Sequence, residues 1–152
     1  MLYTPTVSDS KTVLSVPTGK SFDLVMEHFI YSCPDTPPYA YEQTELITLR
    51  TAEDKMEKVF HIKKVVRCPP MDVEATYEIP IPIRKRLMGY IPVAQHRGIL
   101  TNPRQPYRFY ILDEDGYTPL PHCPHTSTRS KGAVYFTLAE LAAGRPTVLP
   151  IP

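Results

Sequence analysis

Hydrophobic and polar residues follow one another along the N-terminal part of the chain in patterns that predict a strand and then a helix. A strand is predicted at 12–16, where apolar residues precede Pro17. Residues 21–31 carry apolar side chains at helical spacing, with Ser21 as the predicted N-cap. We therefore expect a helix that ends before Pro34.

Two longer apolar runs follow and predict a hairpin. Residues 45–50 and 58–66 have the composition of strands and are separated by the polar segment 51–57. Alternation in the second run places Lys63 on a face rich in basic residues, which suits either solvent or phosphate.

The centre of the chain has the least regular pattern. An extended run is predicted at 79–82, followed by a short helix at 83–88 that stops at Gly89. A clear strand is predicted at 108–112. The acidic segment 113–116 reads as a turn, after which the chain returns as the other arm of a hairpin.

The C-terminal part has the strongest local helix signal. A short strand at 133–135 leads to Thr137, which with Glu140 three residues later forms a capping box. Gly144 is placed to end the helix. The remaining residues, 145–152, are expected to form a tail that is either loose or docked.

Composition narrows the fold class. The chain has 152 residues, of which 42% are hydrophobic, and this suits one domain spanning 1–152. It contains 18 Pro and 6 Gly, and so much proline excludes a helical bundle because interior prolines break helices. We therefore predict an α+β fold.

Charge is nearly balanced overall but uneven along the chain. Lys and Arg number 17 against 16 Asp and Glu. Between 79 and 112, however, the sequence has six basic residues and no acidic one: Arg84, Lys85, Arg86, Arg97, Arg104 and Arg108. These residues either converge on a basic face that could contact phosphates or are scattered in solvent.

The number of cysteines and the first residues of the sequence indicate the cellular compartment in which the protein is expected. Three cysteines, with no C-x-x-C pair, fit a reducing cytosol better than a secreted disulfide framework. The start MLYTPTVSDS lacks the features of a secretory signal, and no window has 18 consecutive apolar residues. We expect a cytoplasmic protein with no membrane partner.

One short segment has metal-binding chemistry. His122, Cys123 and His125 are potential zinc ligands, and Cys68 or Cys33 could complete a set of four. Their spacing matches no standard zinc pattern, so a proline-rich surface loop is the alternative interpretation.

The order of these features resembles the PUA-like superfamily, which includes the ASCH and EVE modules. The resemblance rests on the strand ending in Val16-Pro17-Thr18, the helix after it, the hairpin at 46–66, and the closing segments 120–125 and 132–141. It covers about two thirds of the chain in order. It implies a small mixed or antiparallel β-barrel, a pseudo-barrel, with two or three short helices.

The resemblance also implies binding rather than turnover. PUA-like domains generally hold RNA or DNA, and some accept a flipped or modified base in an aromatic pocket. Candidates for base stacking are Tyr39, Tyr41 and Tyr110. Candidates for phosphate contacts are Arg50, Lys63, Arg84, Arg86 and Arg108. The alternatives are a protein-interaction module of a larger complex and a zinc-dependent enzyme.

Overall fold

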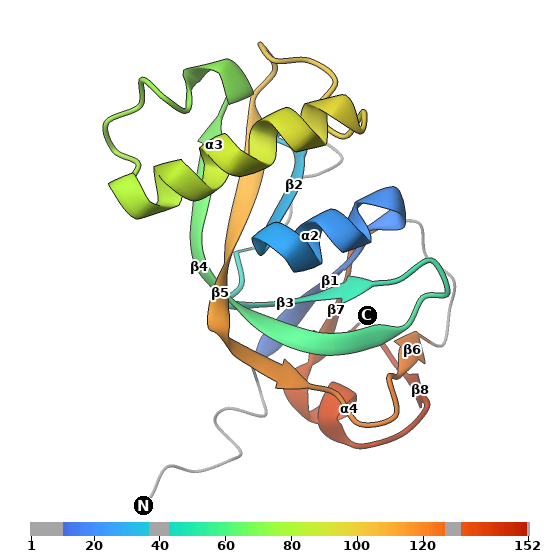
Figure 1. The fold of residues 1–152 in the computed structure, drawn as a ribbon. Coiled ribbons are helices and arrows are strands. Elements are labelled where there is room, and N and C mark those ends of the chain that lie inside the picture. Colours follow the sequence, from blue (N-terminus) through green and yellow to red (C-terminus); the bar gives the residue numbers. More distant parts are fainter. Residues whose placement is uncertain (1–10, 37–42, 127–131, 152) are drawn as a thin grey trace, which may run out of the picture. The chain divides into compact units, whose positions relative to one another are not determined.

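The structure is a computed structural model that describes residues 11–36, 43–126 and 132–151. Its described residues form an α+β fold with a six-stranded mixed sheet, a separate pair of short strands and three α-helices (Figure 1). The predicted fold class is therefore confirmed at this level.

The elements are short except for two long strands and one long helix. The six-stranded sheet contains β1 (Thr12–Pro17), β2 (Ile30–Pro34), β3 (Leu46–Arg50), β4 (Met56–Cys68), β5 (Tyr107–Pro119) and β7 (Val134–Thr137). The small sheet pairs β6 (His125–Thr126) with β8 (Thr147–Val148). The helices are α2 (Phe22–His28), α3 (Ile81–His96) and α4 (Leu138–Ala142), with 3₁₀ turns η1 (Gly19–Ser21) and η2 (Pro70–Asp72).

The large sheet has the strand order β2-β5-β4-β3-β1-β7. Strand β1 runs parallel to β3, while β1–β7, β2–β5 and β3–β4 are antiparallel. Within the described residues β2 and β7 end this order and do not pair with each other, so closure into a barrel is not confirmed.

The chain divides into two compact units, each assembled from separate segments. Unit 1 comprises the described residues within Met1–Phe22, Glu42–Ile62 and Asp113–Pro152. Unit 2 comprises those within Asp23–Tyr41 and Lys63–Leu112.

The core of unit 1 lies under β1, β3 and β7. Val13 and Phe136 face each other across the β1–β7 pair, and both are completely buried together with Met56 and Leu141. The antiparallel pairing of β3 with β4 confirms the predicted hairpin. This cluster joins the first described strand of the chain to its C-terminal segments, because apolar side chains from both are buried together.

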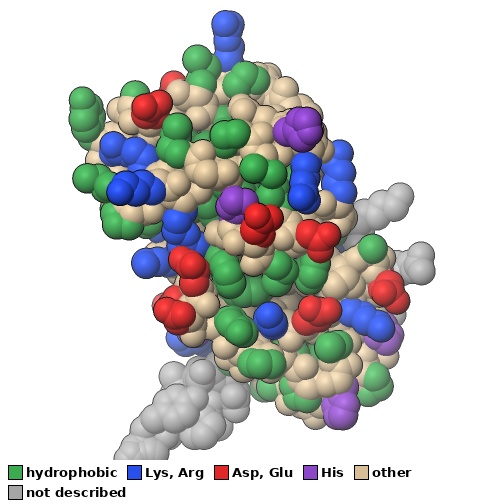
Figure 2. Space-filling model, in the orientation of Figure 1, with side chains coloured by type: hydrophobic (Ala, Val, Ile, Leu, Met, Phe, Trp, Pro, Cys, Tyr) green, Lys and Arg blue, Asp and Glu red, His purple; other side chains and the backbone are tan. Residues whose placement is uncertain are grey.

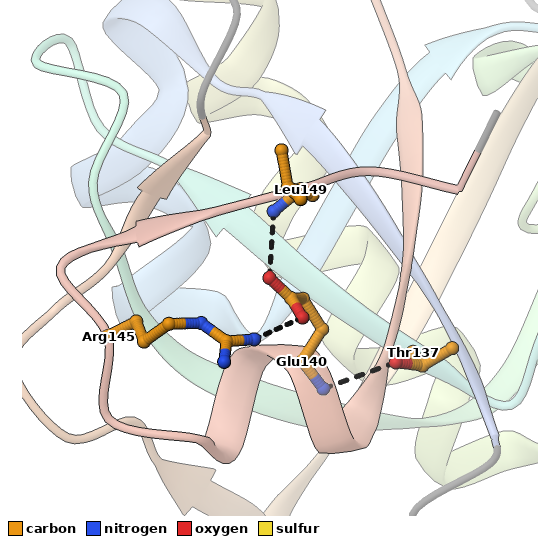
Figure 3. A network of polar contacts seen from close by, with 4 residues as sticks. All are labelled: Thr137, Glu140, Arg145 and Leu149. Atoms are coloured by element: carbon orange, nitrogen blue, oxygen red, sulfur yellow. Dashed lines mark hydrogen bonds and ion pairs between the residues drawn. The ribbon is translucent and has the colours of Figure 1, made fainter.

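Glu140, which is predicted to complete the capping box, holds the C-terminal tail instead (Figure 3). Thr137 Oγ1 accepts the backbone N–H of Glu140 at 3.1 Å, so the predicted N-cap is confirmed. The Glu140 carboxylate turns instead to the tail, where it pairs with Arg145 and accepts the N–H of Leu149 at 2.9 Å. Val148 is completely buried, so the described part of the tail docks on unit 1.

In unit 2, helix α3 covers one face of the sheet formed by β2, the start of β5 and the end of β4 (Figure 1). Leu87 and Tyr90 of α3 are completely buried against Phe109 and Ile111 of β5. The rings of Tyr90 and Phe109 meet edge to face, with their centroids 6.4 Å apart. This packing positions the opposite face of the same strands.

The first helix is shorter than predicted. It ends before Phe29, whose φ of 55° leaves the helical region, and Ile30 begins β2. Ile30 is completely buried and lies opposite Ile111, so sheet pairing replaces the last helical turn. Ser21 is not an N-cap, because its hydroxyl donates to the carbonyl of Thr18 at 2.7 Å.

The central helix is longer than predicted, since α3 continues through Gly89 and Pro92. Glycine costs a helix about 1 kcal/mol relative to alanine, and burial of one large apolar side chain offsets this. Pro92 leaves the carbonyl of Met88 without its helical donor. Met88 and Pro92 both lie on the exposed side of α3, where water can donate a hydrogen bond to the Met88 carbonyl.

The acidic turn predicted at 113–116 does not form, and β5 continues through it. The Asp113 carboxylate accepts the N–H of Asp115 at 3.0 Å, which satisfies that donor without reversing the chain. Farther along, the Tyr117 ring packs beside Phe60 of β4, and Lys58 Nζ lies 4.6 Å from its centroid. Contacts across to β4 thus hold this segment extended.

Candidate nucleic-acid interface

The candidate interface is the face of the unit 2 sheet opposite α3. Along β4, Val66 and Cys68 point to the α3 core, so alternation places Lys63, Val65 and Arg67 on the other face. Lys63 and Arg67 are both exposed. One strand therefore presents two cations on the same side.

The neighbouring strands add aromatic and polar groups to this face. On β5, Phe109 packs under α3, so Arg108 and Tyr110 point to the opposite side. In the β2–β5 pair, Tyr31 lies opposite Tyr110 and Cys33 opposite Arg108. The Tyr31 and Tyr110 rings are 6.0 Å apart between centroids and both are buried.

Arg108 is the centre of a buried polar cluster. Its Nη2 donates to Asp35 Oδ1 at 2.9 Å, and its Nη1 donates to the Tyr110 hydroxyl at 3.3 Å. Burial acts to lower the pKa of Arg108, but the hydrogen bonds to Tyr110 and Asp35 outweigh it and raise the pKa. The guanidinium is therefore charged and already paired within the protein.

Cys33 lies beside this cluster and is held neutral. Burial raises the pKa of its thiol to about 12, against an opposing effect of Arg108 and a smaller one of Arg67. A thiol is a nucleophile only as the thiolate. Cys33 is therefore unsuited to covalent catalysis near neutral pH.

The buried thiol of Cys33 and the buried phenol of Tyr90 predict a loss of stability at alkaline pH. The folded protein keeps the protons of Cys33 and Tyr90 up to about pH 12, chiefly because both groups are buried. In the unfolded chain these protons are released at the ordinary pKa values, 9.0 for Cys33 and 10.0 for Tyr90. Because the unfolded state then binds fewer protons, the free energy of unfolding should fall as pH rises from about 9 to about 12.

Denaturant unfolding at a series of alkaline pH values tests this prediction. Cys33→Ala and Tyr90→Phe should each make the decline with pH shallower, whatever they do to the stability at neutral pH. Substituting the exposed Cys123 with alanine should leave the slope unchanged. Equal slopes in the wild type and the Cys33→Ala, Tyr90→Phe double variant would contradict the assignment.

The structure places Arg50, a predicted phosphate contact, inside unit 1. Its side chain is completely buried. Nη1 donates to the carbonyl and the hydroxyl of Ser15, at 2.9 Å each, and Nη2 donates to the carbonyl of Gly132. In this position Arg50 cross-links β1 to the segment before β7 and does not face solvent.

Arg84 and Arg86 lie on α3, on the other side of the unit 2 sheet from Arg108 and Tyr110. Arg84 Nη2 donates to two backbone carbonyls of the preceding segment at 3.0 Å each. Arg86 Nη2 reaches three carbonyls, those of His28, Phe29 and Leu112. The predicted set therefore does not converge: Lys63, Arg108 and Tyr110 share one face, and these two arginines do not belong to it.

Two predicted stacking residues, Tyr39 and Tyr41, lie outside the described residues. Sequence reasoning also missed Arg67, because the predicted strand stopped at 66. Extending the alternation of Lys63 and Val65 by two residues would have found it. Asp35 carried no recognisable signal, since its pairing with Arg108 depends on the register of β2 and β5.

The segment with zinc-binding chemistry forms an exposed turn. His122 and Cys123 have φ values of 61° and 42°, and both side chains are exposed. His125 Nε2 lies 3.5 Å from Thr147 Oγ1. In the described part of the chain, no three His, Cys, Asp or Glu side chains gather in a way that could hold a metal ion.

Comparison with known proteins adds no assignment. No family model matches the chain, and neither the curated proteins nor the solved structures contain a match. Among the described residues, none of the helices has the length and apolar character needed to cross a bilayer.

Proposed function

We propose that the protein is a nucleic-acid-binding module that contacts the sugar–phosphate backbone and catalyses no reaction. The observation that carries the proposal is the pair of exposed cations, Lys63 and Arg67, on one face of β4. Their unit has nine Lys and Arg residues against six Asp and Glu, whereas unit 1 has eight against ten. An excess of basic residues favours contact with a polyanion.

The chemistry of the two side chains suits phosphate. The Arg67 guanidinium can donate two parallel hydrogen bonds to phosphate oxygens, and the Lys63 ammonium acts as a point charge. Arg108 is buried, and its two terminal nitrogens already donate to Asp35 and Tyr110, so it supports the sheet face and does not reach out to solvent. Contacts of this kind position a strand of RNA or DNA without reading its sequence.

Base stacking is not part of this proposal. Tyr31 and Tyr110 are 6% and 4% exposed, too little to offer a ring face to a base. The pseudo-barrel and the reading of a flipped or modified base are further implications of the PUA-like resemblance, and the phosphate contacts proposed here do not depend on them.

Salt-dependent binding of labelled oligonucleotides tests the proposal, with single-stranded and duplex RNA and DNA as probes. Affinity should fall steeply with salt because binding releases counterions. In the Lys63→Ala, Arg67→Ala double variant we expect affinity near 0.1 M salt to drop at least about tenfold. The slope of log affinity against log salt should become shallower by about two, one for each cation removed.

A second double variant provides a charge-matched control. Lys20→Ala with Lys55→Ala removes two exposed cations from unit 1 and changes the net charge equally. We expect it to weaken binding by less than about twofold, because neither lysine is one of the proposed phosphate contacts. Equal losses in the two double variants, or no binding by any probe at low salt, would refute the proposal.

A further inference from the structure

The strand face of unit 2 that the proposed function uses presents cations but no aromatic ring to a base. Among the described residues, the parts of β2, β4 and β5 that belong to this unit carry four aromatic side chains. All four are buried: Tyr31, Tyr107, Phe109 and Tyr110. A nucleic acid on these strands would therefore be held by the exposed Lys63 and Arg67 and not by stacking.

The α3 side of the same unit is less suited to a polyanion. Figure 2 shows hydrophobic side chains open to solvent over α3, with basic side chains among them. Ile81 and Met88 of this helix are 64% and 40% exposed, and their side chains have no hydrogen-bond donor for a phosphate. Arg84 and Arg86 already donate to backbone carbonyls. Phosphate contacts are therefore expected on the strand face.

A site that has cations but no stacking ring favours a duplex over a single strand. Proteins that hold single strands without sequence preference combine a basic groove with aromatic rings on which the bases stack. In a duplex the bases already stack on one another, and the phosphates lie on the outside. A duplex also has the higher charge density, so each phosphate contact releases about 0.9 counterions, against about 0.7 for a single strand.

The spacing of the two cations is compatible with a duplex. Lys63 and Arg67 are four residues apart on β4, which places their Cα atoms about 13 Å from each other. The major groove of B-form DNA is about 12 Å wide, so the two side chains can meet phosphates on both sides of one groove. On the basis of the proposed function, we infer that the ligand of this face is a nucleic-acid duplex and not a single strand.

Competition binding with the full chain tests this choice. A labelled duplex of two helical turns, about 20 base pairs, is displaced by unlabelled duplex or by either of its separate strands, as DNA and as RNA. At equal nucleotide concentration and about 0.1 M salt, the duplex should compete at least about tenfold better than either strand. The slope of log affinity against log salt should be about 1.8 in magnitude for the duplex and about 1.4 for a single strand.

The outcomes separate this inference from the proposed function. Single strands that compete as well as the duplex, or better, overturn the duplex preference but leave phosphate binding in place. Absence of binding by every probe at low salt removes the proposed function, and the duplex preference with it. A duplex preference that persists unchanged in the Lys63→Ala, Arg67→Ala double variant overturns the assignment of the duplex to this face.

Adding a ring to the face provides a second test. By alternation along β4, Val65 lies on the same face between the two cations, and it is half-buried. Val65→Tyr supplies a stacking ring and should raise single-strand affinity at least about fivefold, with duplex affinity changed by less than about twofold. Val65→Ile, which adds apolar volume without a ring, should change neither. A Val65→Tyr variant that is folded by circular dichroism but gains no single-strand affinity overturns the inference.

Discussion

Replacing Arg50 with alanine is expected to lower the free energy of unfolding by about 3 to 5 kcal/mol. The substitution leaves a cavity in a fully buried position, which alone costs a few kcal/mol. It also removes the donors to the carbonyls of Ser15 and Gly132. The Ser15 carbonyl is buried, and leaving it unsatisfied costs about 1 to 3 kcal/mol, whereas Gly132 is exposed and water can bind its carbonyl. These effects overlap, so their sum is an upper limit.

Urea unfolding monitored by circular dichroism measures this loss. Arg50→Met fills much of the volume without donating hydrogen bonds, and it also removes the cost of burying a charge. Its stability should therefore lie between those of Arg50→Ala and the wild type. Arg104→Ala, which truncates an exposed arginine, should change stability by less than about 0.5 kcal/mol. An Arg50→Met variant that is fully stable but loses nucleic-acid binding would show that Arg50 is a binding residue after all.

The second large effect is expected for Leu87→Ala, at about 2 to 5 kcal/mol. Leu87 is completely buried in the cluster that joins α3 to Phe109 and Ile111 of β5. This packing explains how a helix interrupted by glycine and proline can extend over 16 residues. Removing the side chain should therefore weaken the attachment of the whole helix as well as create a cavity.

Thermal and urea unfolding test this prediction. Gln95→Ala is the control, because Gln95 lies on the same helix with its side chain exposed. It should alter stability by less than about 0.5 kcal/mol. Equal effects of the two substitutions would mean that α3 does not pack on the sheet through Leu87.

The candidate interface could be predicted from the sequence only where its residues share one strand. Lys63 was found because alternation within β4 places it on a polar face, and the same rule extends to Arg67. Arg84, Arg86 and Arg108 were grouped because they are near in sequence. Arg84 and Arg86 lie on α3, which covers one face of the sheet, whereas Arg108 points from the other face. Residues that are close in the sequence are therefore on opposite sides of the sheet.

The sequence by itself determined those elements whose signals are local. Strand β1, the β3–β4 hairpin and the Thr137 cap all follow from alternation or from contacts within a few residues. Tertiary structure decided the rest. Gly89 is tolerated because burial of the opposite side of α3 outweighs its helix cost, β5 passes through an acidic segment because contacts with β4 hold it extended, and Arg50 is internal because distant carbonyls surround it. Such outcomes depend on partners brought together from far along the chain, and their free energies exceed the local preferences from which predictions are made.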